Sequence, residues 1–291
     1  MNKCAWEKSK EQHMSDIDYF KPVSTWAAQK VREFICAKDN REYNLVDVRQ
    51  PGEYERGHLP GARLIPVGQL GDRLAELDPG KITIVYCASG VRSQAAASVL
   101  EQAGFQEVYS MAGGINAWRG LVAGGFPEAG ISWFSAARSV YELIALAWVL
   151  EDGTKTFYEK MAGTTADKDV AALFRELVKA EEGHKEMLTS LYRGMSGAVG
   201  EVDFPSLLAG YPQEKTMEGG MRLDDAIAWA NGRGGRELLD LSISLEISSY
   251  DRYQTLQRRL NGENSLKILS SIAAEEKLHL VSLTELFEKY L

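Results

Sequence analysis

The alternation of apolar and polar positions differs between the first and the second part of the chain. Between residues 20 and 125, short apolar runs alternate with helical patterns. One helix is expected to begin at Ser24, with the serine as its cap, and another to span 91–104 and end at a glycine. Strands that alternate with helices predict an α/β domain around a mainly parallel sheet. The expected strands are 44–49, 63–67, 81–87 and 107–111.

Beyond residue 130 the strand pattern stops and four long helical patterns follow, near 132–162, 166–194, 235–261 and 263–290. Short turns join the first pattern to the second and the third to the fourth, whereas a long connection separates the two pairs. This order predicts an all-α four-helix bundle with one crossover, which carries a short helical pattern of its own at 223–230. The predicted organisation is an N-terminal extension (1–19), the α/β domain (20–123), a glycine-rich linker (124–131) and the bundle (132–291, crossover 195–234).

Composition and charge narrow the class of protein. The chain is 45% hydrophobic and 25% charged, which is typical of globular domains, and its net charge of −8 disfavours a nucleic-acid surface. The N-terminus lacks the apolar core of a signal peptide, and no apolar run approaches the roughly 20 residues that span a bilayer. Three cysteines are too few for a disulfide framework. We therefore expect a cytoplasmic protein with no nucleic-acid or membrane partner.

The segment YCASGVRS, which begins at Tyr86, is the first candidate site. A strand that ends at Cys87 and leads through a glycine-containing turn into a helix directs backbone N–H groups toward the sulfur atom. Arg92 adds a full positive charge. Such a field lowers the pKa of a thiol and stabilises a thiolate or a persulfide anion. On these residues alone, a buried structural cysteine before an ordinary turn is an equal alternative.

Further motifs surround this loop in the same domain. They are Asp47 and Arg49 at a strand end, Glu53, Gly57-His58 with Gly61-Ala62, and Gly113-Gly114 with Trp118. Together with Cys87, they closely resemble the rhodanese family of sulfurtransferases over residues 20–123. The loop CASGVR also has the six-residue length of the sulfurtransferases, whereas related dual-specificity phosphatases use a loop one residue longer. The resemblance therefore favours sulfur over phosphate as the group that the loop holds.

The resemblance implies a role for each of these residues. Cys87, assisted by Arg92, would carry sulfane sulfur from a small-molecule donor, such as thiosulfate or a persulfide, to an acceptor thiol. Backbone amides of the loop would hold the persulfide; the loop residues are Ala88, Ser89, Gly90 and Val91. Four others are expected to organise the loop and the neighbouring turns: Asp47, Arg49, Glu53 and His58.

The helical part contains two Glu-x-x-His pairs, Glu181 with His184 and Glu276 with His279. Residues at i and i+3 share one face of a helix, so both members of a pair can reach the same metal. One such pair is weak evidence, because acidic helix faces are common. Two pairs in a chain with only four histidines are stronger evidence.

The spacing around the two pairs reveals an internal repeat. Glu151 lies thirty residues before Glu181, and Glu246 lies thirty residues before Glu276. Each unit therefore has the order Glu…Glu-x-x-His, and the two units are offset by 95 residues. Unpaired acids among apolar helix positions are costly to bury, and a pair of metal ions supplies the compensating charge. Four carboxylates and two imidazoles suit two iron or manganese ions with positions left open for oxygen ligands.

This pattern resembles the rubrerythrin branch of the ferritin-like superfamily over residues 133–291. The resemblance implies that Glu181 and Glu276 bridge two irons, with manganese or zinc as alternatives, and that Glu151 and Glu246 are terminal ligands. It departs from the family in two ways. Ser249 stands where rubrerythrins often have a further carboxylate, which puts the family's redox-driven ligand movement in doubt. No four-cysteine rubredoxin module is present, so an external electron donor is expected. Three tyrosines, which either hydrogen-bond to ligands or only pack, are Tyr158, Tyr250 and Tyr253.

These features lead to one expectation and several alternatives. We expect a rhodanese-like α/β domain that transfers sulfur through a Cys87 persulfide, followed by a ferritin-like bundle whose diiron centre reduces peroxide. The fusion suggests that the two activities are coupled. A ferroxidase or iron-storage bundle, a redox or sulfur sensor with little turnover, and a rhodanese domain that only docks partners are the alternatives. A homodimer is expected, because four-helix modules commonly pair through apolar faces.

Overall fold

The computed structural model describes residues 23–124, 140–196, 215–260 and 262–291. The expected extension (1–19) and the expected linker (124–131), apart from Gly124, lie outside these residues. The chain divides into two compact units. The first unit comprises the residues up to Tyr54 together with Ala62–Gly120, and the second comprises Glu55–Gly61 together with Leu121–Leu291.

The first unit is built on a five-stranded, fully parallel sheet with the strand order β1-β5-β4-β2-β3. Its central strands, β2 and β4, are buried apolar segments, and Asp47 at the end of β2 pairs with Tyr86 at the end of β4. The two strand ends therefore meet at one edge of the sheet, where α/β proteins place their functional loops. The strands are β1 (Thr25–Ala27), β2 (Tyr43–Asp47), β3 (Arg63–Leu64), β4 (Ile82–Tyr86) and β5 (Val108–Ala112).

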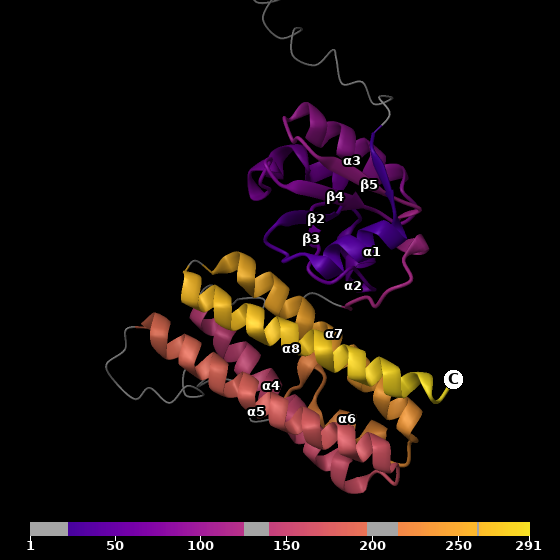
Figure 1. Cartoon of the computed structure of the whole chain (residues 1–291), viewed down its shortest axis with the longest axis vertical. Coiled ribbons are helices and arrows are strands. Elements are labelled where there is room, and N and C mark those ends of the chain that lie inside the picture. Colours follow the sequence, from indigo (N-terminus) through magenta and orange to yellow (C-terminus); the bar gives the residue numbers. More distant parts are fainter. Residues whose placement is uncertain (1–22, 125–139, 197–214, 261) are drawn as a thin grey trace, which may run out of the picture. The chain divides into compact units, whose positions relative to one another are not determined.

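Helices connect the strands as the α/β pattern predicts (Figure 1). They are α1 (Ala28–Ala37), α2 (Pro51–Glu55) and α3 (Val91–Gln102), with 3-10 turns η1 (Val67–Gln69), η2 (Gly71–Glu76) and η3 (Gly114–Ala117). The expected helix start at Ser24 is wrong. Residues Thr25–Ala27 form β1 instead, because they pair with Ser110–Ala112 of β5, and the cap of α1 is Ala27 without a side-chain hydrogen bond. A tertiary strand pairing here overrides a local helix signal.

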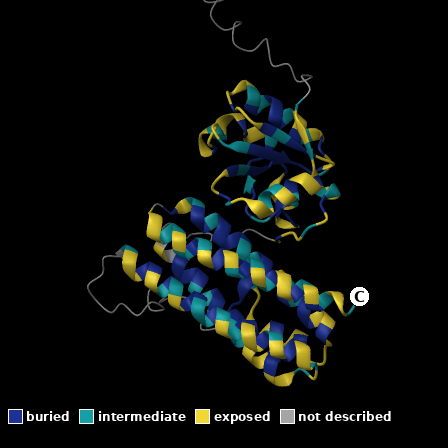
Figure 2. Cartoon of the chain, viewed as in Figure 1, coloured by how far each residue is buried: buried dark blue, intermediate teal, exposed yellow. Residues whose placement is uncertain are grey.

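The second unit is helical and contains the four predicted long helices (Figure 1). Apolar and polar positions alternate so that each long helix has one buried and one exposed face (Figure 2). No helix of the described ranges is long and apolar enough to cross a membrane. The long helices are α4 (Val140–Thr164), α5 (Lys168–Ser196), α7 (Gly235–Arg259) and α8 (Glu263–Glu288). The described part of the crossover contributes η5 (Glu218–Gly220) and α6 (Leu223–Ala230), the latter at the predicted position.

Two apolar clusters fill the helical unit. The first includes Leu150, Leu188, Tyr253 and Ala273, and the second includes Phe157, Leu177, Leu245 and Leu283. On each long helix, the predicted metal ligands lie between a residue of the first cluster and a residue of the second. The helices therefore hold a polar layer between two apolar ones, so these acids are enclosed rather than solvated.

The crossover segment is seated on α4 beside this polar layer. A Cβ atom on Gly153 would lie 2.8 Å from the carbonyl carbon of Thr216, so only glycine admits the crossover backbone at this distance. Lys215 Nζ donates to Asp152 Oδ2 at 2.8 Å, and the N–H of Glu218 donates to Thr154 Oγ1 at 3.1 Å. These contacts attach the crossover to the helix turn that carries Glu151.

Candidate functional site

Cys87 lies directly after β4, and its side chain is buried in the loop that leads into α3. The backbone N–H of Gly90 donates to Cys87 Sγ at 3.1 Å. Gly90 adopts a left-handed conformation with φ of 100°, and a Cβ atom there would lie 3.3 Å from the backbone nitrogen of Gly113. The glycine therefore lets the chain turn back over the sulfur atom.

The surroundings of Cys87 favour its thiolate. Burial acts to raise the pKa of the Cys87 thiol, but the backbone and hydroxyl groups of Ser93 and the N–H groups of Gly90 and Ser89 outweigh it and lower the pKa. Ser93 was not among the predicted site residues. Its hydroxyl donates to the carbonyl of Gly90 at 3.0 Å and lies 2.8 Å from Ser110 Oγ. Its position directly after Arg92, on the first turn of α3, was the available signal.

Arg92 is held by a glutamate from a different segment. Its two terminal nitrogens donate to the two carboxylate oxygens of Glu53, each at 2.7 Å. This bidentate pair is the main cause that lowers the pKa of Glu53 to about 2, and Glu53 in turn raises the pKa of Arg92 above its ordinary value. The pairing restricts the guanidinium, whose charge also interacts with Cys87.

The segment after the Gly113-Gly114 motif hydrogen-bonds to the cysteine loop. The N–H of Ile115 donates to the carbonyl of Cys87 at 2.8 Å, and the N–H of Asn116 donates to that of Ala88 at 3.0 Å. A Cβ atom on Gly114 would lie 2.6 Å from the carbonyl carbon of Ala88. Since Gly114 also has a φ of 56°, no other residue fits this close approach without strain.

The other predicted residues of the α/β domain lie in different environments. Asp47 and Arg49 form a buried ion pair at 2.6 Å, and the Arg49 guanidinium lies 5.7 Å from the centre of the Tyr86 ring, so this pair does lie beside the strand that carries Cys87. His58 belongs to the second unit. Its Nε2 atom lies 3.1 Å from Asp251 Oδ2 of α7, within the second unit. Val91 is 74% exposed at the start of α3.

In the second unit, the four long helices bring all six predicted metal ligands together. Two overlapping groups have ligand atoms that all lie within 4.8 Å of one another. The first group is Glu151, Glu181, His184 and Glu276, all buried, and the second is Glu181, Glu246 and His279. Residues from the two halves of the repeat thus share one site. The ring centres of His184 and His279 are 5.5 Å apart.

The donor atoms of this cluster fit a metal centre. Within the described residues, five buried side-chain atoms of the cluster lack a hydrogen-bond partner. They are Glu151 Oε2, Glu181 Oε2, Glu276 Oε2 and both ring nitrogens of His184. Buried polar atoms without partners are costly, and carboxylate and imidazole atoms grouped in this way are ligands for iron, manganese or zinc. The residues present can therefore hold the metals that the ligand pattern implies.

The pKa values of the cluster are shifted in different directions, because its groups are buried and lie close together. Burial and the charge of Glu151 raise the pKa of Glu181 well above its ordinary value, whereas the neighbouring His184 offsets burial and lowers the pKa of Glu276. Burial raises the pKa of Glu246 to about 7. For His279, burial acts to lower the pKa, but the carboxylates of Glu246 and Glu276 raise it to about 10. A bound cation would therefore change the protonation of these carboxylates and imidazoles.

Tyr158 and Tyr253 hydrogen-bond to carboxylates of the cluster. The Tyr158 hydroxyl donates to Glu246 Oε1 at 2.5 Å, and the Tyr253 hydroxyl donates to Glu151 Oε1. Each tyrosine therefore holds the first glutamate of the other repeat. Tyr250 packs against apolar clusters. Ser249, at the position of the missing carboxylate, donates to Glu276 Oε1 at 2.7 Å.

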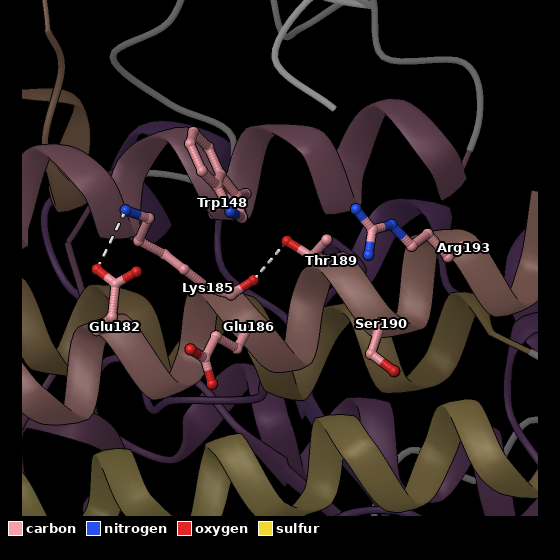
Figure 3. A pocket seen from close by; sticks show the side chains of 7 residues that line it. All are labelled: Trp148, Glu182, Lys185, Glu186, Thr189, Ser190 and Arg193. Atoms are coloured by element: carbon pink, nitrogen blue, oxygen red, sulfur yellow. Dashed lines mark hydrogen bonds and ion pairs between the residues drawn. The ribbon is translucent and has the colours of Figure 1, made fainter. Parts of the chain in front are cut away.

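An open pocket of about 380 Å³ lies on the surface of α4 and α5, and none of the six ligands lines it (Figure 3). Lys185 and Glu182 point toward each other in Figure 3, and Trp148 lies beside them. Lys185 Nζ donates to Asp152 Oδ1 at 2.7 Å and lies 4.7 Å from the centre of the Trp148 ring. This lysine therefore contributes to the contacts between α4 and α5.

Comparisons with known proteins agree with both units. Residues 28–121 match the Rhodanese-like domain family, and residues 113–192 match the Rubrerythrin family. The rubrerythrin match includes the ligands of the first repeat and ends before those of the second. The second set of ligands is therefore placed by the fold of this chain rather than by the family match.

Individual relatives match the first unit. "Uncharacterized protein YqhL" from Bacillus subtilis is 43% identical over 82 residues, 28% of this chain and 65% of that protein, so the chain spans less than two thirds of it. "Thiosulfate sulfurtransferase GlpE" from Pseudoalteromonas translucida is 36% identical over 80 residues, 28% of this chain and 76% of that protein. A rhodanese-related protein from Thermoplasma volcanium has 31% identity, covers 35% of this chain and 98% of its own, and gives a TM-score of 0.31. The chain belongs to the rhodanese-like family through its first unit, which is fused to a rubrerythrin domain.

Proposed function

We propose that the first unit transfers sulfane sulfur through Cys87. The observation that carries this proposal is the hydrogen bond of 3.1 Å from the Gly90 N–H to Cys87 Sγ, in a loop that lowers the pKa of the thiol. Arg92, held by Glu53, adds positive charge for an anionic donor. The GlpE relative is named for thiosulfate, which makes thiosulfate the first donor to test.

The proposed reaction has two steps. The Cys87 thiolate attacks the outer sulfur of thiosulfate, the sulfur–sulfur bond breaks, and sulfite leaves with its electron pair. The product is a Cys87 persulfide anion, whose charge the loop amides and Arg92 stabilise. An acceptor thiolate then attacks the terminal sulfur, takes it as a new persulfide, and leaves the Cys87 thiolate free for another cycle.

The test is sulfite release from thiosulfate with cyanide or a small thiol as the acceptor. We expect turnover by the full chain and none above background by Cys87→Ser. Cys36→Ser is the matched control, because Cys36 is an exposed thiol on α1, away from the loop. Equal loss of activity in both variants, or activity in Cys87→Ser, would contradict the proposal.

We also propose that the second unit reduces hydrogen peroxide with two iron ions held by the six-residue cluster. The observation that carries this proposal is the set of buried, unpartnered carboxylate and imidazole atoms within 4.8 Å of one another. Glu151, Glu181, His184 and Glu276 would hold one ion, and Glu181, Glu246 and His279 would hold the other. Bound iron would supply the two electrons that convert peroxide and two protons into water.

The chain's own residues would keep the ligands in place during this reaction. Tyr158 and Tyr253 donate to Glu246 and Glu151, which fixes one oxygen of each carboxylate and leaves the other for a metal. Ser249 orients Glu276 in the same way. Because Ser249 carries no carboxylate, we propose that the ligand set stays the same throughout the cycle. An external electron donor would complete turnover.

The test is metal binding followed by rapid mixing. The metal-free full chain is expected to bind about two ferrous ions without air, and peroxide is expected to oxidise the loaded protein faster than dioxygen does. Faster reaction with dioxygen would instead support a ferroxidase. Glu276→Ala should lose metal, whereas Glu285→Ala, an exposed glutamate on the same helix, should keep it. If the wild-type chain binds no metal, the proposal is wrong.

A further inference from the structure

The two ring nitrogens of His184 face different carboxylates. Nδ1 lies 3.3 Å from Glu181 Oε2 and 3.3 Å from Glu276 Oε1, inside the ligand cluster. Nε2 faces away from these two and lies 3.4 Å from Glu275 Oε2. Glu275 belongs to neither group of metal ligands and was not singled out by the sequence pattern. The geometry therefore assigns Nδ1 to the metal and leaves Nε2 for Glu275.

His184 Nε2 needs a partner in this position. The His184 side chain is fully buried, and within the described part of the chain Nε2 makes no hydrogen bond of ordinary geometry. The Glu275 carboxylate lies a few tenths of an ångström beyond a good hydrogen bond. Its side chain is 42% exposed, so water solvates the carboxylate and its charge is not costly to keep at this place.

The internal repeat supplies such a carboxylate to one of the two histidines and not to the other. The offset of 95 residues that relates Glu151 to Glu246 also relates Ala180 to Glu275 and His184 to His279. The repeat thus provides a carboxylate for the first imidazole and an alanine at the corresponding place for the second. The His279 side chain is 13% exposed, so water can reach the second imidazole. The two histidines therefore differ in the side chain that the repeat places beside them.

We propose that Glu275 is a positioning residue of the metal centre. Its carboxylate accepts the Nε2–H of His184, which fixes the tautomer with a free lone pair on Nδ1 and orients that lone pair toward the metal. A carboxylate that accepts the second N–H of a ligating imidazole typically strengthens metal binding by about 10- to 100-fold. The His184 half of the site therefore binds metal more tightly than the His279 half. This inference rests on the proposed metal centre.

The experiment titrates the metal-free full chain with Co²⁺, whose visible absorption and paramagnetic proton shifts report each ligand shell. In the wild type we expect two binding steps of unequal affinity and an exchangeable, shifted N–H signal from the tighter step. Glu275→Ala should weaken the tighter step by about 10- to 100-fold, abolish this signal and leave the other step unchanged. Glu275→Gln keeps an acceptor oxygen, so it should retain the signal and most of the affinity.

Controls separate this role from charge and from folding. Glu285→Ala removes an exposed carboxylate from the same helix and should change neither step. Ala180→Glu supplies the missing carboxylate to the second half and should tighten the weaker step. Helix content by circular dichroism should match the wild type in every variant.

The outcomes distinguish the two proposals. Unchanged Co²⁺ affinities and an unchanged N–H signal in Glu275→Ala would overturn the role of Glu275 and leave the metal centre standing. A Glu275→Gln variant as weak as Glu275→Ala would also overturn it, since charge alone would then explain the loss. A wild-type chain that binds neither Co²⁺ nor Fe²⁺ would overturn both proposals.

Discussion

The cysteine site and the carboxylate cluster obtain their polarity from different parts of the chain. Around Cys87, backbone N–H groups of one short loop and the hydroxyl of Ser93 act on the sulfur atom. In the helical unit, side chains from four helices, spread between Glu151 and His279, act on one another. In a loop of consecutive residues, the local backbone conformation determines most of the electrostatic field at the site. A site built from four helices exists only after the helices pack.

The two sites also differ in how complete they are. The Cys87 loop is a hydrogen-bonded structure whose carbonyl groups are bound by Ile115 and Asn116. The cluster buries carboxylate and imidazole atoms that lack partners within the described residues. Buried, unsatisfied polar groups reduce stability, and a bound cation offsets that cost. The first site is therefore preorganised by the fold, whereas the proposed metal centre would gain stability from a bound cation.

The largest expected effect is a complete separation of the two activities. Cys87→Ser should abolish sulfur transfer and keep full metal binding, and Glu276→Ala should do the reverse, because each site is held within its own unit. Sulfite release and metal content per chain, measured on the same preparations, provide the check. Loss of peroxide reduction in metal-loaded Cys87→Ser would break the comparison and favour a coupled reaction.

A large effect is expected at the glycine that supports the cysteine loop. Gly114→Ala places a methyl group against the carbonyl of Ala88, so the loop must move, and displacement of a reacting group by about 1 Å can lower a rate about 100-fold. Sulfite release measures the loss, and metal binding should not change. Gly52→Ala, with open space around its Cβ, is the control. A fully active Gly114→Ala would show that the loop does not depend on this packing.

A smaller effect is expected where the crossover meets α4. Gly153→Ala should destabilise the helical unit by about 1–3 kcal/mol, because the added methyl group meets the backbone of Thr216. Gly163→Ala lies on the same helix with open space around its Cβ, so it should be neutral or stabilising by up to about 1 kcal/mol. Guanidinium unfolding followed by circular dichroism compares the two. Equal stability of both variants would mean that the crossover does not pack at Gly153.

The smallest effect is a shift in the pH dependence of sulfur transfer. Because the hydrogen bonds of Ser93 lower the pKa of Cys87, the thiolate forms below the usual thiol range, and the rate should rise with pH and reach its plateau there. Ser93→Ala removes the hydroxyl and should raise that pKa, which slows the reaction at neutral pH and restores it at higher pH. Ser98→Ala, buried on the same helix, should leave the profile in place. Coincident profiles for all three proteins would contradict the role of Ser93.

The sequence predicted the elements well where one periodicity acts over a long stretch. The helices α4, α5, α7 and α8 and the short α6 follow their apolar patterns, and the strands follow their apolar runs. It failed at residues Thr25–Ala27, which look like a capped helix start but pair with β5. That pairing joins segments more than eighty residues apart in the chain, so no local pattern contains it.

The sequence by itself determined which residues are candidates for the chemistry, because Cys87 lies in a contiguous motif and the six predicted ligands repeat at a fixed spacing. Only the tertiary structure decided what surrounds them. It placed Ser93 beside the thiol, turned His58 toward Asp251, and brought Glu275 to the second nitrogen of His184. Those contacts depend on how helices and strands rotate and pack. Spacing along one helix specifies which side chains share its face, but not which side chain of another helix they meet.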